Sequence, residues 1–443
     1  MSPVMHFSPY VRSVSQNNQV VILNLKNGRW IKITSGVWFI LQDFIEGTGD
    51  ISIQLQNADV TAGEFGEFVD CLKEYGFLAE TQDETLPVWN QPVAAYLNLT
   101  ERCNLQCKTC YFAAKVESDL AEMSTETTTT AMNKLAGAGI KYIVLAGGEP
   151  LLRSDLATIL LEARKHFEDV TLITNGTLVN AEIARSIAED TNQVQVSLDG
   201  PDEASNSQIR GKGAFERAIN GVDLLKEAGA KILLVCTITK VNIGLVPRMA
   251  TLARELGVEL GSSIFLATGH GACNEKCLSP AWQDLLADFR DEIFQLAEKD
   301  ELPESQYTST SNLRVGMSCG SGTQLISIAP DGTIYPCHVL HRPEYVIGSI
   351  TNNDDLLSTL NSSPVVRRFR QLNVEQRRGC KGCDVRYFCR GGCIAQGISN
   401  TGRLGGKDKF CPLFTRVFRA QVWSIDDQMT DNEKAKALVE ALS

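Results

Sequence analysis

The chain has little that would suit it to a membrane or to nucleic acid. Its 443 residues include 42 Lys and Arg against 53 Asp and Glu, which gives a formal net charge of −11. No apolar run approaches the roughly 20 residues that a membrane span needs. An acidic chain offers no broad surface to nucleic acid, which argues against a tRNA-modifying enzyme. The sequence therefore predicts neither a membrane nor a nucleic-acid partner.

Features of secreted proteins are also missing. The stretch from Met1 to Pro9 has no basic region followed by an apolar one, so we expect a cytoplasmic protein without a signal peptide. Fourteen Cys in 443 residues is far below the density of a disulfide scaffold. Clustered Cys in such a chain favour metal binding. Cys71 and Cys236 lie in apolar runs, and we expect both to be inert buried thiols.

The clearest motif is Cys103-x3-Cys107-x2-Cys110, directly after an apolar run that ends at Thr100. Cubane iron–sulfur clusters usually take four Cys, so a run of three predicts a cluster with one exchangeable site. The alternatives are a zinc site or unrelated core thiols. Zinc sites usually combine two Cys pairs, or Cys with His, and no His lies near this loop.

Strand-like and helix-like segments alternate after this motif. The nearly continuous apolar runs indicate parallel strands buried on both faces. Helical patterns between them are clearest at 181–189 and 214–228. Six such units predict an α/β fold with an incomplete parallel barrel and function in the loops at the strand ends. The predicted strands are 94–100, 140–146, 170–175, 193–199, 232–239 and 262–267.

The loops after these strands carry further candidates. Gly147-Gly148-Glu149-Pro150 follows the second strand, where glycines let backbone approach a ligand and a carboxylate can pair with an ammonium group. Other candidates are Asn175, Ser197, Asp199 and Arg210. A second set of seven Cys follows in the C-terminal third, in the order Cys319, Cys337, Cys380, Cys383, Cys389, Cys393 and Cys411.

These motifs resemble those of radical S-adenosylmethionine (SAM) enzymes with a C-terminal SPASM domain. The resemblance implies that Cys103, Cys107 and Cys110 hold a [4Fe–4S] cluster whose open iron binds the methionine moiety of SAM. It also implies that Arg210 pairs with the methionine carboxylate. The implied cofactor contacts are Gly147, Gly148, Glu149, Asn175, Ser197 and Arg210. One departure is Thr109, which stands where the family usually has an aromatic residue or His near the adenine.

The SPASM resemblance implies two auxiliary [4Fe–4S] clusters, three in all. Cys380, Cys383, Cys389 and Cys411 would hold the outer one, and Cys319, Cys337 and Cys393 the inner one. The inner cluster is then one ligand short. Either it keeps an open site, where a substrate Cys could bind as thiolate, or Cys273 or Cys277 fills it.

Residues 1–85 form a separate unit in this interpretation. Asn27-Gly28 predicts a hairpin turn between two strands, and Thr61 to Glu64 reads as a capping box that opens a helix. The pattern resembles the winged-helix domain that binds leader peptides in many peptide-modifying enzymes, by strand addition in one recognised mode. A purely structural cap is the alternative. The remaining predicted units are the barrel (93–310), the SPASM domain (311–420) and a helical tail (421–443).

The resemblance implies a maturase of a ribosomally made precursor peptide, supplied with electrons by a flavodoxin or ferredoxin-type reductant. A 5′-deoxyadenosyl radical would take a hydrogen from the peptide, and a thioether would form, as in sactipeptide and ranthipeptide maturases. Carbon–carbon cross-linking is one alternative. An anaerobic sulfatase maturase is a further alternative, and His338 argues against it because those enzymes have an Asp base at this position. A non-catalytic electron carrier would need neither Gly147–Pro150 nor Arg210. The sequence identifies no catalytic base: His338, His341 and Asp331 are expected near the inner cluster, and each could be structural instead.

Overall fold

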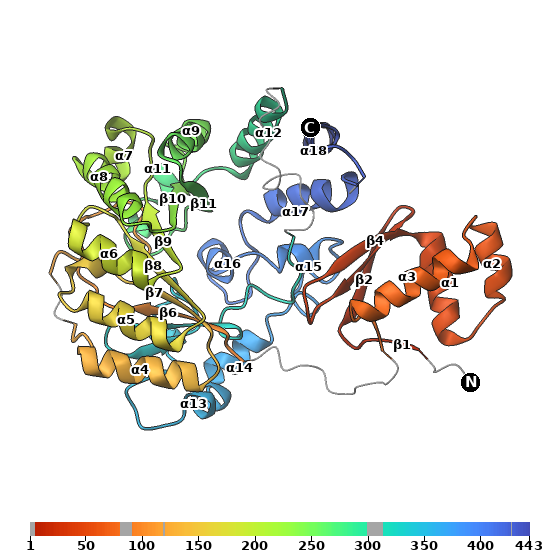
Figure 1. Ribbon diagram of the computed structural model, residues 1–443, viewed down its shortest axis with the longest axis horizontal. Helices are drawn as coiled ribbons and strands as arrows, with labels where there is room; N and C mark the ends of the chain where they lie inside the picture. The colour runs from red at the N-terminus through yellow and green to blue at the C-terminus, as the bar shows by residue number, and fades with distance from the viewer. Residues whose placement is uncertain (1–4, 80–90, 118–119, 299–312, 427) are drawn as a thin grey trace.

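The computed structural model describes residues 5–79, 91–117, 120–298, 313–426 and 428–443 (Figure 1). Its centre is a nine-stranded sheet in the order β11-β10-β9-β8-β7-β6-β12-β13-β14. Six consecutive strands run parallel, as predicted, but the sixth is formed by residues 259–264 and not by the predicted 262–267. They are β6 (Ala94–Asn98), β7 (Tyr142–Ala146), β8 (Asp169–Thr174), β9 (Gln193–Ser197), β10 (Ile232–Ile238) and β11 (Glu259–Ile264).

Helices follow each of these strands, as the alternating pattern predicts. Four of these helices, at residues 125–137, 156–166, 181–190 and 214–227, pack side by side along the sheet (Figure 1). Leu145, Leu172, Val196 and Leu234 are fully buried beneath them and form the barrel core. The helices of this unit are α4 (Thr125–Gly137), α5 (Leu156–His166), α6 (Ala181–Asp190), α7 (Glu203–Arg210), α8 (Ala214–Glu227), α9 (Val246–Leu256), α10 (His270–Cys273), α11 (Glu275–Leu278) and α12 (Trp282–Glu298).

The C-terminal unit is joined to the barrel by a strand. β12 (Leu325–Ile328) pairs in parallel with β6, and β13 (Thr333–Tyr335) and β14 (Gly348–Ser349) extend the sheet antiparallel. This brings the loop after β13 beside the loop after β6. The predicted boundary at residues 310 and 311 lies outside the described residues.

Short helices complete this unit, and one of them, α18 (Asp431–Leu442), lies within the predicted tail of residues 421–443. One face of α18 is buried against α12, because Ala435, Leu438 and Leu442 recur at helical spacing. The other helices are α13 (Leu356–Ser362), α14 (Pro364–Arg370), α15 (Arg386–Cys389), α16 (Ile394–Thr401) and α17 (Cys411–Arg419), which continues as a π-helical turn over Ala420–Ser424.

The N-terminal unit is a three-stranded antiparallel sheet followed by three helices. The predicted hairpin is confirmed, and so is the capping box of Thr61 and Glu64. The third strand, β2, was not predicted. The elements are β1 (His6–Phe7), β2 (Val11–Gln16), β3 (Gln19–Asn24), β4 (Trp30–Thr34), α1 (Ser35–Glu46), α2 (Ile51–Asn57), α3 (Ala62–Glu74) and β5 (Leu78–Ala79). The predicted end of this unit near residue 85 lies outside the described residues.

One thiol prediction is wrong. Cys71 is exposed, not buried, because α3 turns Phe65, Val69 and Leu72 inward and leaves Cys71 on its solvent side. Cys236 in β10 is buried, as predicted.

The N-terminal sheet is buried on both faces. One face packs on α1–α3, and the other packs on the C-terminal unit, where Val21 and Leu23 join Tyr387 and Phe388 in one apolar cluster. Arg12 in β2 adds an ion pair to Glu375, with 2.7 Å between Nε and Oε1. Among the described residues, no helix is long and apolar enough to cross a membrane.

Candidate active site

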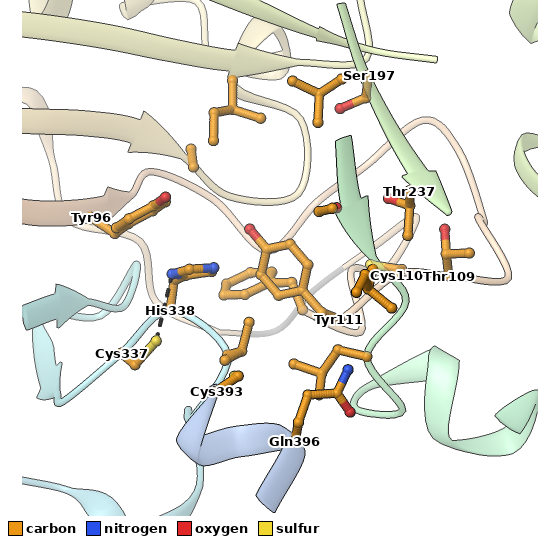
Figure 2. Close-up of a pocket in the computed structure, with 18 of the residues that line it drawn as sticks. Tyr96, Thr109, Cys110, Tyr111, Ser197, Thr237, Cys337, His338, Cys393 and Gln396 are labelled. Atoms are coloured by element: carbon orange, nitrogen blue, oxygen red, sulfur yellow. Dashed lines mark hydrogen bonds between the residues drawn. The ribbon is translucent and has the colours of Figure 1, made fainter. Parts of the chain in front are cut away.

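A central cavity of about 900 Å³ lies at the carboxyl ends of the barrel strands (Figure 2). The lining comes from the loop after β6, the ends of β7 to β11 and the loops that follow, the end of α7, and the C-terminal unit. The first set of thiols (Cys103, Cys107, Cys110) and the inner set (Cys319, Cys337, Cys393) both face this cavity. Two thiol groups that are far apart in sequence therefore share one space.

Two glycines allow the loop after β7 to lie directly on the loop that carries the first set. A Cβ at Gly147 would come within 2.6 Å of the Thr100 carbonyl oxygen, and one at Gly148 within 2.2 Å of that of Arg102. The Gly148 N–H donates to the Thr100 oxygen at 2.7 Å, and the Glu149 N–H to the Arg102 oxygen at 2.8 Å. The glycines are thus needed for backbone contact, and both line the cavity.

Glu149 is fully buried and does not line the cavity. Its carboxylate accepts hydrogen bonds from the Thr174 hydroxyl at 2.7 Å, the Asn175 N–H at 2.8 Å and the Leu151 N–H at 3.1 Å. Burial raises the pKa of Glu149, and these donors oppose that rise. The structure places this predicted cofactor contact as a brace between the loops after β7 and β8.

Asn175 holds the first thiol loop from the other side. Its amide nitrogen lies 2.9 Å from Asn104 Oδ1 and 3.9 Å from Cys103 Sγ. Burial raises the pKa of Cys103 to about 12, so this thiol is protonated at neutral pH before a metal binds. Asn175 also lines the cavity, as does Ser197, whose hydroxyl has no hydrogen-bond partner among the described residues.

Arg210, at the end of α7, lines the same cavity. Its Nε lies 2.8 Å from the Asp199 carboxylate, which is fully buried and accepts a hydrogen bond from the Thr237 N–H at 2.8 Å. Burial works against the charged guanidinium, yet Asp199 and the Cys107 thiol keep the pKa of Arg210 raised. Its terminal nitrogens have no hydrogen-bond partner among the described residues, so they are available to an anionic group.

The seven C-terminal thiols fall into the two predicted groups. Burial raises the pKa of Cys337 to about 12 and that of Cys393 to about 11, and repulsion from the other thiols of the inner set adds to the rise. The outer set lines a small pocket of about 30 Å³ and consists of Cys380, Cys383, Cys389 and Cys411. Burial, and repulsion from the other thiols of this set, raise the pKa of Cys380 and of Cys389. Cys389 lines both the small pocket and the central cavity.

A sharp turn separates Cys389 from Cys393. Arg390, Gly391 and Gly392 all have positive φ, at 54°, 81° and 69°. A Cβ at Gly392 would meet the Asp408 carboxylate at 2.7 Å, and this carboxylate accepts the Cys393 N–H at 2.8 Å. The turn sends two thiols that are four residues apart to different groups.

The donor sets fit iron–sulfur clusters. All fourteen Cys are free of disulfide bonds. Three free thiols around one cavity are the type of ligand that iron–sulfur clusters bind. No group of three or more His, Cys, Asp or Glu among the described residues is arranged to hold a single metal ion. Cys273 and Cys277 are exposed and line neither pocket, so the structure does not bring them to the inner set.

Cys273 and Cys277 belong to helices that cover the first thiol loop. A Cβ at Gly269 would come within 2.5 Å of the Tyr111 carbonyl oxygen. Asn274 donates to the Lys108 carbonyl oxygen at 3.1 Å. These two short helices therefore hold the first loop in place.

Sequence reasoning missed an aromatic wall between the first and inner sets. His338 stacks on Tyr96, with 4.1 Å between ring centroids, and meets the edge of Tyr111 at 5.2 Å (Figure 2). Its Nδ1 lies 3.7 Å from Cys337 Sγ, and burial lowers the pKa of His338 to about 4. Tyr111 directly follows Cys110, so its place after the third Cys was the available signal. His341 is bound to the Ser327 hydroxyl at 2.9 Å.

A second missed feature is a row of phenylalanines along the cavity. Phe410, Phe414 and Phe418 recur at helical spacing along α17 and its start, and all line the cavity together with Phe388. Phe414 and Phe418 are only half-buried. The strand ends add polar side chains to the lining, among them Ser197 and Thr237. The cavity can therefore accept a substrate with both apolar and polar parts.

Comparisons with known proteins agree with this geometry. Residues 97–253 match the family described as Radical SAM superfamily, and residues 319–384 match the iron-sulfur cluster-binding domain SPASM. Mycofactocin maturase MftC of Mycolicibacterium smegmatis is 30% identical over 336 residues, which cover 72% of this chain and 82% of that protein. PqqA peptide cyclase of Gluconobacter oxydans is 28% identical, over 74% of this chain and 92% of that protein.

Two groups of solved structures share the fold. Native anSMEcpe with bound AdoMet has a TM-score of 0.61 at 20% identity and covers 74% of this chain and 96% of its own. Streptococcus suis SuiB bound to S-adenosylmethionine has a TM-score of 0.58 at 17% identity and covers 91% of this chain and 98% of its own. SuiB is also known bound to its precursor peptide SuiA. The SuiB match reaches further over this chain than the anSMEcpe match does.

Proposed function

Because the chain belongs to the radical SAM superfamily and carries the SPASM domain of peptide-modifying relatives, we propose that it forms a thioether in a ribosomally made precursor peptide. The bond would join a Cys sulfur to a carbon of the same peptide. The observation that supports this is the shared cavity, with the first set on one side and the three thiols of the inner set on another.

The first set and its neighbours would hold the SAM cluster and SAM. Arg210 has free terminal nitrogens for the methionine carboxylate, and the backbone at Gly147 and Gly148 lines the cavity close to Cys103. Ser197 offers an unpaired hydroxyl. When bound, the cluster and SAM would supply a 5′-deoxyadenosyl radical that takes one hydrogen atom from the peptide, while the Cys thiol would lose its proton and the remaining electron would pass to an auxiliary cluster. The protein's part is to position the peptide and exclude water.

The inner set would orient the peptide thiol. The inner set has three thiols. Cys389 also lines the cavity, but it belongs to the outer set, and Cys273 and Cys277 are exposed outside the cavity. A substrate Cys is then a suitable fourth ligand, since metal binding favours its thiolate. The Tyr96–His338 stack beside Cys337 would fix the peptide between the two thiol sets.

The test is anaerobic reconstitution followed by incubation with reductant, SAM and a Cys-containing precursor. Mass spectrometry should show loss of two hydrogens per modification, with the thiol no longer alkylable after disulfides are reduced. A precursor in which that Cys is Ser is the matched control and should stay unmodified. Modification of the Ser precursor would overturn the thioether assignment.

A second candidate is ring closure between carbons, which the similarity to PqqA peptide cyclase supports. That reaction needs no substrate thiol. Loss of two hydrogens with every thiol still alkylable would select it.

We also propose that the N-terminal unit binds the leader part of the precursor. Its sheet has β2 at one edge, and strand addition there would give backbone hydrogen bonds to an extended peptide. Removing residues 1–79 should weaken precursor binding while peptide-independent cleavage of SAM remains. The same removal uncovers the apolar face near Phe388, so melting of the truncated protein must be measured beside it. Unchanged precursor affinity would assign the unit a structural role.

A further inference from the structure

Two features of the central cavity have no part in holding clusters or SAM. One is the phenylalanine row, Phe410, Phe414 and Phe418, along α17 and its start. The other is the end of β11, where Ser262 and Ser263 line the same cavity. Apolar rings and an uncharged strand end are not metal ligands, so we ask which part of a substrate they fit.

β11 offers a free backbone edge. It pairs with β10 and, in the part of the chain that the structure describes, with no other strand, so one row of its N–H and C=O groups is unpaired. The Phe265 N–H donates to the Ile238 carbonyl oxygen of β10 at 3.0 Å, and alternation along the strand therefore directs the Ser262 N–H to the free edge. Ser262 and Ser263 are exposed and point to opposite faces, so a cavity lined by both reaches this edge.

Helix α17 leads from this edge toward the N-terminal unit (Figure 1). Phe414 packs in one apolar cluster with Ile264 of β11, and Phe418 packs in another with Val21 and Leu23 of the N-terminal sheet. Both phenylalanines are only partly buried, and both line the cavity. The row therefore connects the unit proposed to bind the leader with the cavity that the first thiol set lines.

The spacing of the row matches that of an extended peptide. Four residues along a helix advance it by about 6 Å, and side chains on one face of an extended chain recur at about 6.6 Å. A peptide along α17 thus brings every second side chain first to Phe414 and then to Phe418. The whole row from Phe410 to Phe418 is about 12 Å long, which is the length of about four extended residues.

We propose that the phenylalanine row and the free edge of β11 form the subsite for the core segment of the precursor, which carries the residues to be joined. The segment lies extended, with its backbone paired to β11 and with apolar side chains at positions i and i+2 against Phe414 and Phe418. The inference rests on the proposed function, because it requires a peptide substrate. It adds a substrate class, namely precursors with aliphatic or aromatic residues at alternate positions beside the modified residue.

Binding of short peptides to the reconstituted holoenzyme tests the subsite without any cross-linking. The probe is a fluorescein-labelled peptide of Gly and Ser with Leu at i and i+2, and its isomer of equal composition has Leu at i and i+1. Fluorescence anisotropy should show about tenfold tighter binding of the alternating peptide, because only that peptide places both Leu side chains on the row. Equal binding of the two peptides, or no binding of the alternating one, would overturn the proposal.

Variants locate the bound peptide on the protein. Phe414→Ser should weaken binding of the alternating peptide about tenfold, and Phe414→Leu should restore most of the affinity. Ser262→Pro removes the outward N–H of an edge strand and should also weaken binding, whereas Ser262→Ala keeps this donor and should lose clearly less. Phe39→Ser, at a side chain of α1 that is 65% exposed, is the matched control and should bind like the unchanged protein. Melting and iron content confirm that each variant is folded and loaded.

Three other results would contradict the proposal. Weaker SAM binding by Phe414→Ser in equilibrium dialysis, with unchanged peptide binding, would make the row a wall of the SAM site. Weaker peptide binding by Phe39→Ser, with Phe414→Ser unchanged, would place the peptide on the N-terminal unit. Equal losses in Ser262→Pro and Ser262→Ala would exclude backbone pairing to β11. Failure of thioether formation concerns the proposed function alone, because the probes contain no Cys and their binding is measured without turnover.

Discussion

Arg210 and Asp199 form a buried ion pair at the rim of the central cavity, with 2.8 Å between Nε and Oδ2. Asp199 lies in the loop after β9, and its carboxylate also accepts a hydrogen bond from the Thr237 N–H of β10. The pair therefore fixes the Arg210 side chain to the ends of two adjacent strands, β9 and β10. An arginine held in this way presents its remaining donors with little loss of entropy when a carboxylate binds.

Asp199→Asn should weaken both SAM binding and the fold. Removing one partner of a buried pair leaves an uncompensated charge, which costs about 3–5 kcal/mol. Thermal melting and equilibrium dialysis with SAM measure the two effects. Arg248→Ala, which breaks the exposed pair with Asp202, is the control and should change melting little. Wild-type SAM affinity in Asp199→Asn would contradict the assigned role of Arg210.

Replacing Cys103, Cys107 and Cys110 together by Ala should abolish 5′-deoxyadenosine formation and lower the iron content by one cluster. The reason is that the only thiols of the loop after β6 are removed, while the inner and outer sets stay intact. Cys71→Ala, on the exposed side of α3, is the matched control and should keep full iron and activity. Normal 5′-deoxyadenosine formation by the triple variant would refute the radical mechanism.

Gly148→Ala should displace the first thiol loop, because the added Cβ would lie 2.2 Å from the Arg102 carbonyl oxygen. We expect loss of SAM binding and partial loss of iron from the first set. Gly66→Ala in α3 has open space around the new Cβ and should raise stability by about 0.5–1 kcal/mol. If Gly148→Ala binds SAM normally, the close contact of the two loops is not required.

The iron-free chain should lose stability as pH rises above about 9. Burial raises the pKa of Cys103, Cys337 and Cys389 from an ordinary value of about 9 to about 12. Between these values the folded chain keeps protons that the unfolded chain releases, so the free energy of unfolding falls with pH. Melting of the iron-free and iron-loaded proteins at pH 7.5 and pH 10 checks this. The loaded protein should decline less, since its thiols are already deprotonated.

Much of the fold was readable from local pattern. Apolar runs predicted the first five parallel strands closely, because strands buried on both faces are largely apolar. The sixth, Glu259–Ile264, was placed three residues too late, because most of its residues are polar or small and all are exposed or only partly buried. The capping box of Thr61 predicted the start of α3 because those hydrogen bonds are local. The third N-terminal strand was missed, since Val11–Gln16 alternates weakly and gains its burial from β3 and the C-terminal unit.

The sequence by itself determined the chemistry: the types and spacings of the thiols and the order of strands and loops that carry them. Those features depend on residue identity and on neighbours along the chain. The division of the C-terminal thiols was predicted by resemblance alone, and only the tertiary structure shows its physical cause. Cys389 and Cys393 part because three consecutive residues of positive φ reverse the chain between them. It also decided that Glu149 braces loops and that Tyr96, Tyr111 and His338 meet, since β12 pairs with β6 across more than 200 residues and no local signal encodes that pairing.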